Sequence, residues 1–281
     1  MASSQIQKSV IVTGGASGIG LAMTRHFASQ GHKVAVLDIN GATGPGIIAE
    51  VTAEYPQASV SFDKCDVSSW EEQAAVFKKV YGEHGRIDVV MANAGISEQG
   101  QSSIVRVEDD APVKPDTKSI DVNFLGAIYS VKLALHYMHK NKDDGSPSRG
   151  SVIVTASNAG VYPFPVAPLY AAAKAGLVNL VRSLGPALER SKIQINALAP
   201  AVLDSDVLET NIAPSKDLFK PMIVTPMSTL TKGVAQFIAD PSLNGQVAEI
   251  HGDSVTIRAP PDYVDEDSRK NLETFWNLGY A

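Results

Sequence analysis

Cysteine is almost absent from this sequence, and long apolar runs and basic clusters are missing as well. Cys65 is the single cysteine among 281 residues. A single cysteine excludes an internal disulfide and is typical of a protein in a reducing compartment. No apolar run approaches the roughly 20 residues needed to cross a bilayer. The net charge is −6, and without a Lys/Arg cluster we expect neither nucleic acid nor a membrane surface as a partner.

Targeting signals and metal-binding patterns are also missing. Residues 1–8 are polar and too short for a signal peptide, and Leu278–Ala281 matches no retention tag, so a cytoplasmic protein is expected. His136 and His139 have no carboxylate at metal-ligand spacing, so no metal site is expected. With 44% hydrophobic and 19% charged residues, the composition is that of a globular protein.

What the sequence does contain is a regular alternation of apolar runs and helical patterns. The apolar runs span 9–13, 33–38, 59–66, 87–92, 151–156, 194–198 and 246–251. The helical patterns lie near 18–30, 45–55, 70–83, 116–140, 168–190 and 226–239. This alternation predicts an α/β fold, a Rossmann-type doubly wound parallel sheet of about seven strands with helices on both faces. We expect one domain over 1–281, with a core at 8–252 and a C-terminal extension at 253–281.

Three stretches interrupt the alternation and are expected to be surface loops or lids: 97–115, 201–225 and 259–281. The last ends with Phe275, Trp276 and Tyr280. This aromatic tail has three open interpretations. It could cover a substrate pocket, pack on another subunit, or dock on its own domain.

A glycine-rich string follows the first apolar run. Thr13-Gly14-Gly15-Ala16-Ser17-Gly18-Ile19-Gly20 lies between a predicted strand and a predicted helix. Glycines there permit a tight turn and a close backbone approach to a pyrophosphate, and the helix N-terminus supplies N–H donors. The string therefore predicts a dinucleotide site with Gly14, Ser17, Gly18, Ile19 and Gly20 as contacts. The alternative is an ordinary turn.

Acidic and amide residues end the next predicted strands. Asp38 lies 18 residues after Gly20, near the spacing of a ribose-binding carboxylate that repels a 2′-phosphate. Since residues 39–41 offer no Arg or Lys, Asp38 favours NAD over NADP; alternatively it is a solvated strand-end acid. Asp66 and Asn93-Ala94-Gly95 also occupy carboxyl ends of strands, where such sheets bind ligands. Each of these alone is typical of a turn or cap.

A possible catalytic group lies in the second half of the chain. Tyr170 and Lys174 are four residues apart on one predicted helix face. A nearby ammonium lowers the pKa of a tyrosine, which could then accept the proton of a substrate hydroxyl. Ser157 could hydrogen-bond the substrate oxygen; otherwise it is a cap or turn serine. Asn123 lies within a predicted helix, where an asparagine side chain is locally unfavourable, and this makes it a further candidate.

Together these motifs, in this order and spacing, resemble the short-chain dehydrogenase/reductase family over roughly residues 8–252. The resemblance implies that Tyr170 is the acid/base and that Lys174 binds the nicotinamide ribose and lowers the pKa of Tyr170. It further implies that Ser157 holds the substrate oxygen and that Asn123 holds a water of a proton relay. Implied cofactor contacts are Asp66 and Val67 beside adenine, Asn93 (with Ala94 and Gly95) on the adenosine ribose side, and Pro200 and Leu203 at the carboxamide.

The sequence departs from the family pattern after the sixth predicted strand. Pro200 is followed by Ala201 where the family usually has glycine, which suggests a negative φ at Ala201, and Ser205 replaces a threonine. Asp38 and Ser242-Leu243-Asn244-Gly245 are similar to 15-hydroxyprostaglandin dehydrogenase-like members. That similarity implies a lipophilic secondary alcohol as substrate, and many similar proteins act in secondary metabolism.

We therefore expect an NAD-dependent alcohol dehydrogenase or ketoreductase acting on a small-molecule alcohol or ketone, and the resemblance suggests a homodimer or homotetramer. Two alternatives remain open. One is an NAD(H)-binding redox sensor without catalysis, and the other is an epimerase or dehydratase on the same fold.

Overall fold

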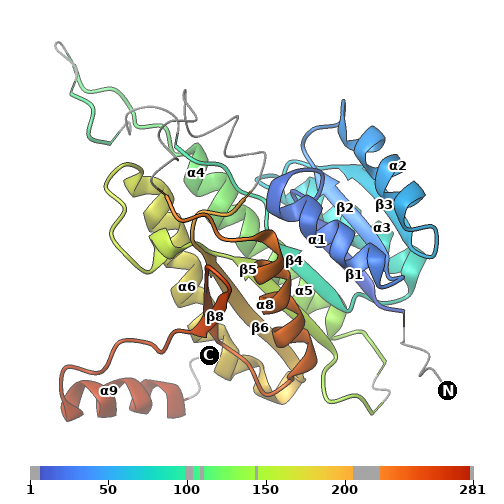
Figure 1. Ribbon diagram of the computed structural model, residues 1–281. Coiled ribbons are helices and arrows are strands. Elements are labelled where there is room, and N and C mark those ends of the chain that lie inside the picture. Colours follow the sequence, from blue (N-terminus) through green and yellow to red (C-terminus); the bar gives the residue numbers. More distant parts are fainter. Residues whose placement is uncertain (1–6, 99–103, 108–110, 143–144, 205–221, 279–281) are drawn as a thin grey trace.

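The computed structural model describes residues 7–98, 104–107, 111–142, 145–204 and 222–278. Within them the strands form one sheet in the order β3-β2-β1-β4-β5-β6-β7-β8 (Figure 1). Each neighbouring pair from β3 to β7 is parallel, and β8 runs antiparallel to β7. The strands are β1 (Ser9–Thr13), β2 (Lys33–Asp38), β3 (Ser59–Lys64), β4 (Val89–Ala92), β5 (Gly150–Thr155), β6 (Ile193–Pro200), β7 (Val247–His251) and β8 (Ser254–Ile257).

Helices cover both faces of this sheet, as the alternating pattern predicted. One apolar core lies between the sheet and α3, α5 and α6, and a second lies between the sheet and α1, α2 and α8. The helices are α1 (Gly18–Ser29), α2 (Gly44–Glu54), α3 (Trp70–His84), α4 (Lys118–Ile120), α5 (Gly126–Met138), α6 (Pro168–Leu188), α8 (Met227–Ala239) and α9 (Glu266–Asn277). Short 3-10 turns are η2 (Asn158–Gly160) and η3 (Glu189–Ser191). The predicted Rossmann-type α/β fold is confirmed.

The strand order fixes where a ligand can bind. β1 pairs with β2 on one side and with β4 on the other. Strands β2 and β3 are added on one side of β1, and β4 and the strands after it are added on the other side. In open α/β sheets this switch point leaves a crevice at the carboxyl ends of the strands. The glycine-rich turn follows β1 and Asn93 follows β4, so both lie at this crevice.

The structure differs from the expectations in the predicted helix over 116–140 and in the C-terminal part of the chain. The predicted helix over 116–140 is divided into α4, a π-helical segment η1 (Asp121–Leu125) and α5. Two elements were not predicted, the edge strand β8 and the helix α9. The stretch 259–281 was expected to be irregular, but Asp265 caps a helix there by accepting a hydrogen bond from the N–H of Ser268 at 2.7 Å. That local cap stabilises the first turn.

Helix α9 stands away from the rest of the chain (Figure 1). None of its residues is buried, and Phe275 and Trp276 are 64% and 52% exposed. These two side chains therefore do not dock on the domain in this structure. Tyr280 lies outside the described residues. Within the described residues, no helix is long and apolar enough to span a membrane.

Candidate active site

The glycine-rich turn has a backbone shape that needs its glycines. Gly14 and Gly18 have φ values of +64° and +47°, a region that L-residues with side chains rarely adopt. A Cβ on Gly20 would lie 1.9 Å from the carbonyl oxygen of Gly14, so α1 can approach the turn this closely only with glycine there. Ser17 is the N-cap residue of α1, and its side chain makes no capping bond. The open, electropositive start of α1 fits a pyrophosphate.

Asp38 ends β2 beside this turn. Its carboxylate is mostly buried and accepts hydrogen bonds from the N–H groups of Ala16, at 3.1 Å, and Asn40, at 3.0 Å. These bonds hold the carboxylate against the glycine-rich turn, a position that fits a ribose contact. The register of β2 and β3 also places Lys64 opposite Asp38. Residues 39–41 contain no cation, and the sequence next to Asp38 does not reveal Lys64.

The end of β4 is tied to its neighbours through Asn93. Its side-chain amide donates to the carbonyl of Thr13 at 3.1 Å and accepts from the hydroxyl of Thr155 at 3.0 Å. The hydroxyl of Thr13 in turn accepts the N–H groups of Asn93 and Ala94. The side chain of Asn93 thus joins the ends of β1, β4 and β5. The structure gives it a bracing role there, beside the implied cofactor contact.

Asp66 and Val67 form a turn after β3. The carboxylate of Asp66 accepts from the N–H and hydroxyl of Ser68 at 2.9 and 2.7 Å. The carbonyl of Val67 accepts from the buried amide of Gln73 at 2.5 Å. Asp66 therefore makes the contacts expected of a turn residue, which was the alternative interpretation of this position. Gln73 braces the same turn, and the sequence did not reveal it.

Lys174 and Tyr170 lie together on α6. The Lys174 side chain is buried, and its ammonium donates to the carbonyl of Thr155 at 2.6 Å and lies 5.6 Å from the centre of the Tyr170 ring. Burial lowers the pKa of Lys174 to about 8 because the charged form loses hydration. Burial also raises the pKa of Tyr170, while its hydrogen bond with Ser157 acts in the lowering direction. Burial outweighs that bond, so the pKa of Tyr170 is raised overall, whereas the sequence predicted a net lowering.

Ser157 reaches Tyr170 from the end of β5. It caps η2 by accepting from the N–H of Ala159 at 3.1 Å, so its cap role and its contact with Tyr170 coexist. The turn can pack on α6 only because of Gly160, where a Cβ would lie 2.6 Å from the carbonyl carbon and oxygen of Lys174. Gly160 is a site-forming residue that sequence reasoning missed. The one feature of the sequence that could have indicated Gly160 is its position three residues after Ser157.

Asn123 lies in the π-helical segment η1 and is 1% exposed. Its amide accepts from the N–H of Ile96 and donates to the carbonyl of Ile96, both at 2.7 Å. Such π-helical segments often occur at functional sites. A Cβ on Gly95 would lie 3.1 Å from the Asn123 amide oxygen and 3.5 Å from the Lys174 nitrogen. The backbone of Gly95 therefore lies beside both of these side chains.

The segment after β6 also reaches this edge of the sheet. Pro200 ends β6, and Leu203 is buried and bridges to Thr225. The bonds of that bridge use the carbonyl of Val202 and the N–H of Asp204, so the backbone of Leu203 does not take part in them. Among the described residues Lys192 is the non-glycine with positive φ, which confirms the expected negative φ of Ala201. Ser205 lies outside the described residues.

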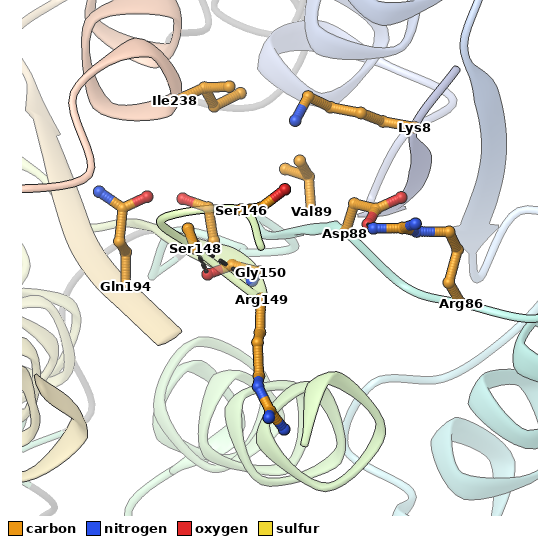
Figure 2. Close-up of a pocket in the computed structure, with 11 residues that line it drawn as sticks. Lys8, Arg86, Asp88, Val89, Ser146, Ser148, Arg149, Gly150, Gln194 and Ile238 are labelled. Carbon is orange, nitrogen blue, oxygen red and sulfur yellow. Dashed lines mark hydrogen bonds and ion pairs between the residues drawn. The ribbon is translucent and has the colours of Figure 1, made fainter. Parts of the chain in front are cut away.

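A polar cavity lies at the opposite edge, where β4 and β5 begin (Figure 2). Arg86 pairs with Asp88 at 2.7 Å there, and Arg149, whose side chain points away in Figure 2, donates to the carbonyl of His139. None of the predicted site residues lines this cavity. The predicted residues gather at the carboxyl edge instead.

The fold is an open α/β sheet, and the glycine-rich turn lies at the point where the strand order reverses. The pair Tyr170 and Lys174 lies at the same edge of the sheet. The family model for short chain dehydrogenase matches residues 8–215. The chain belongs to the short-chain dehydrogenase family, whose members are oxidoreductases that bind a nicotinamide cofactor. This confirms the resemblance seen in the motifs.

Individual relatives extend over most of the chain. Short-chain dehydrogenase/reductase prx6 of Penicillium rubens is 29% identical over 266 residues, which cover 92% of this chain and 86% of the relative. The 15-hydroxyprostaglandin dehydrogenase [NAD(+)] of Bos taurus is 29% identical over 258 residues, covering 86% of this chain and 90% of the relative. The crystal structure of levodione reductase superposes with a TM-score of 0.74 at 26% identity, covering 87% and 96% of the two chains.

Proposed function

We propose that this chain is a single-domain, NAD-dependent dehydrogenase or ketoreductase that interconverts a secondary alcohol and a ketone. One observation carries the proposal. The half-buried Tyr170 has the Ser157 hydroxyl close enough to lower its pKa, and the buried Lys174 ammonium lies 5.6 Å from its ring centre. A redox sensor without catalysis has no need of this buried group.

In the proposed reaction Tyr170 moves one proton at the substrate oxygen. Its raised pKa keeps the phenol protonated near neutral pH, so it can donate that proton to a ketone oxygen. In the oxidation of an alcohol the phenolate form, which has released its proton, accepts the proton of the substrate hydroxyl. Ser157 donates a hydrogen bond to the same oxygen and stabilises the developing alkoxide. A nicotinamide, when bound, supplies or accepts the hydride at the neighbouring carbon.

The surroundings of Tyr170 favour a lipophilic substrate. Phe164 lies 6.4 Å from the Tyr170 ring, centre to centre. Phe164 and Val166, which precede α6, and Ile96, which follows β4, are 42%, 67% and 38% exposed. Exposed apolar side chains gathered beside a reactive group are typical of a ligand-binding surface. The bovine relative is named for a hydroxylated prostaglandin, which agrees with this substrate class.

Asp38 supports NAD as the cofactor. Its carboxylate is held beside the glycine-rich turn by Ala16 and Asn40, where it would accept both ribose hydroxyls and repel a 2′-phosphate. The NAD(+) in the name of the bovine relative supports the same choice.

A panel of lipophilic secondary alcohols and ketones, assayed with NAD(H) through NADH absorbance, tests the proposal. Tyr170→Phe should abolish turnover and leave NADH binding largely intact. Tyr263→Phe is the matched control, because Tyr263 is 49% exposed in the C-terminal extension. Unchanged turnover in Tyr170→Phe contradicts the mechanism. A wild-type protein that binds NADH and turns over no compound supports the sensor instead.

A further inference from the structure

The helix that carries Tyr170 and Lys174 has no cap of its own. Its N-cap residue is Ala167, which has no side-chain acceptor, its first turn contains no acidic residue, and Pro168 has no N–H to donate. Uncapped N–H groups at a helix start need another acceptor. The carboxylate of Glu98 supplies it, accepting from the N–H groups of Leu169 at 2.9 Å and of Tyr170 at 3.1 Å.

The segment that carries Glu98 is anchored at its other end as well. Ile96 is held by the two 2.7 Å hydrogen bonds to the amide of Asn123 in η1. Residues 96–98 therefore join η1 to the first turn of α6, and Gly95 just before them lies against Lys174. One three-residue segment thereby links Asn123 to the backbone of Tyr170.

We propose that Glu98 is a positioning residue for Tyr170. One carboxylate oxygen binds the backbone N–H of Tyr170 itself and of the residue before it, so it fixes the first turn of α6 relative to Asn123 and Lys174. A carboxylate suits this place because its charge opposes the positive end of the helix dipole. This inference rests on the proposed function, since Tyr170 must act on substrate for its position to affect turnover.

Two variants separate the role of the acceptor from the role of the charge. Glu98→Gln keeps an oxygen that can accept both N–H groups, so kcat should stay within about threefold of wild type. Glu98→Leu removes the acceptor from a similar volume, and kcat should fall about tenfold or more. The KM for NAD should change less than about twofold in both variants, because these two bonds of Glu98 are made to the first turn of α6, whereas the predicted pyrophosphate contacts lie in the glycine-rich turn after β1.

Hydrogen exchange tests the same contact without any activity assay. The amides of Leu169 and Tyr170 should be protected in wild type and in Glu98→Gln, and should exchange about tenfold faster or more in Glu98→Leu. The matched control is Asp265→Leu, which removes an equivalent carboxylate cap from α9. It should leave kcat and the two amides of α6 unchanged.

Four outcomes overturn the proposal. These are wild-type kcat in Glu98→Leu, an equal loss of kcat in Glu98→Gln and Glu98→Leu, unchanged exchange at Leu169 and Tyr170, and an equal loss of kcat in Asp265→Leu. Failure of the proposed function looks different, because Tyr170→Phe would then retain turnover. An active wild type with an inactive Tyr170→Phe and a fully active Glu98→Leu refutes the positioning role alone.

Discussion

Replacing Gly160 by alanine should separate Ser157 from Tyr170 and Lys174. The added Cβ would lie 2.6 Å from the carbonyl carbon and oxygen of Lys174, whereas ordinary contact begins at 3.4 Å. Both obstructing atoms belong to the backbone of α6, so no side-chain rotation can relieve the overlap. The turn that carries Ser157 must move from α6 by about 0.8 Å, the difference between these two distances.

A displacement of this size should be costly for catalysis and moderate for stability. A shift near 1 Å in a positioned catalytic group can lower a rate about 100-fold, so we expect kcat to fall between about 10- and 100-fold. Overpacking of this kind costs about 1–3 kcal/mol of the free energy of unfolding. Steady-state kinetics and urea denaturation measure the two effects on the same preparation.

Gly46→Ala is the matched control, since it makes the same chemical change in α2, where a Cβ at Gly46 would meet nothing within 4 Å. It should leave kcat unchanged and raise stability by up to about 1 kcal/mol. Wild-type kcat in Gly160→Ala would refute the reasoning, because it would show that the contact between the Ser157 turn and α6 does not set the reaction geometry.

Two further predictions concern the cofactor and the buried lysine. Asp38→Ala should shift the ratio of kcat/KM values from NAD toward NADP by about tenfold or more. The variant loses the charge that repels a 2′-phosphate, while Lys64 remains opposite this position. An unchanged ratio would exclude a ribose role for Asp38. Burial lowers the pKa of Lys174 from 10.5 to about 8, so between these pH values the unfolded chain binds more protons than the folded chain. The free energy of unfolding of wild type should therefore rise relative to that of Lys174→Met from pH 8 to 10.5, and denaturation curves with the same pH dependence for both would contradict this.

The sequence predicted most of the fold because hydrophobic periodicity acts locally. The strands Ser9–Thr13 and Lys33–Asp38 have the predicted limits, since each is a continuous apolar run bounded by polar residues. The edge strand β8 is four residues long and only partly buried, so it carries too weak a pattern. The π-helical segment η1 differs from an α-helix in hydrogen bonding rather than in composition, and a helical period alone does not reveal it.

The candidate site was predictable where motifs are local and unpredictable where contacts are distant. The turn Gly14–Gly20 and the Tyr170/Lys174 pair show themselves through spacing. Glu98 acts on a helix 71 residues further along, and no local pattern marks that contact. The direction of the Tyr170 pKa shift was also beyond the sequence, because it depends on how deeply the fold buries the ring.

The transfer of deuterium from substrate to cofactor tests the central claim most directly. A lipophilic secondary alcohol that the enzyme turns over is labelled at its carbinol carbon and incubated with NAD, and the recovered reduced cofactor is examined by mass spectrometry. Our account predicts one deuterium in each NADH formed, and no such product with Tyr170→Phe. Deuterium that is lost to solvent, or that stays in a product formed without net NADH, would contradict the account and support an epimerase or dehydratase.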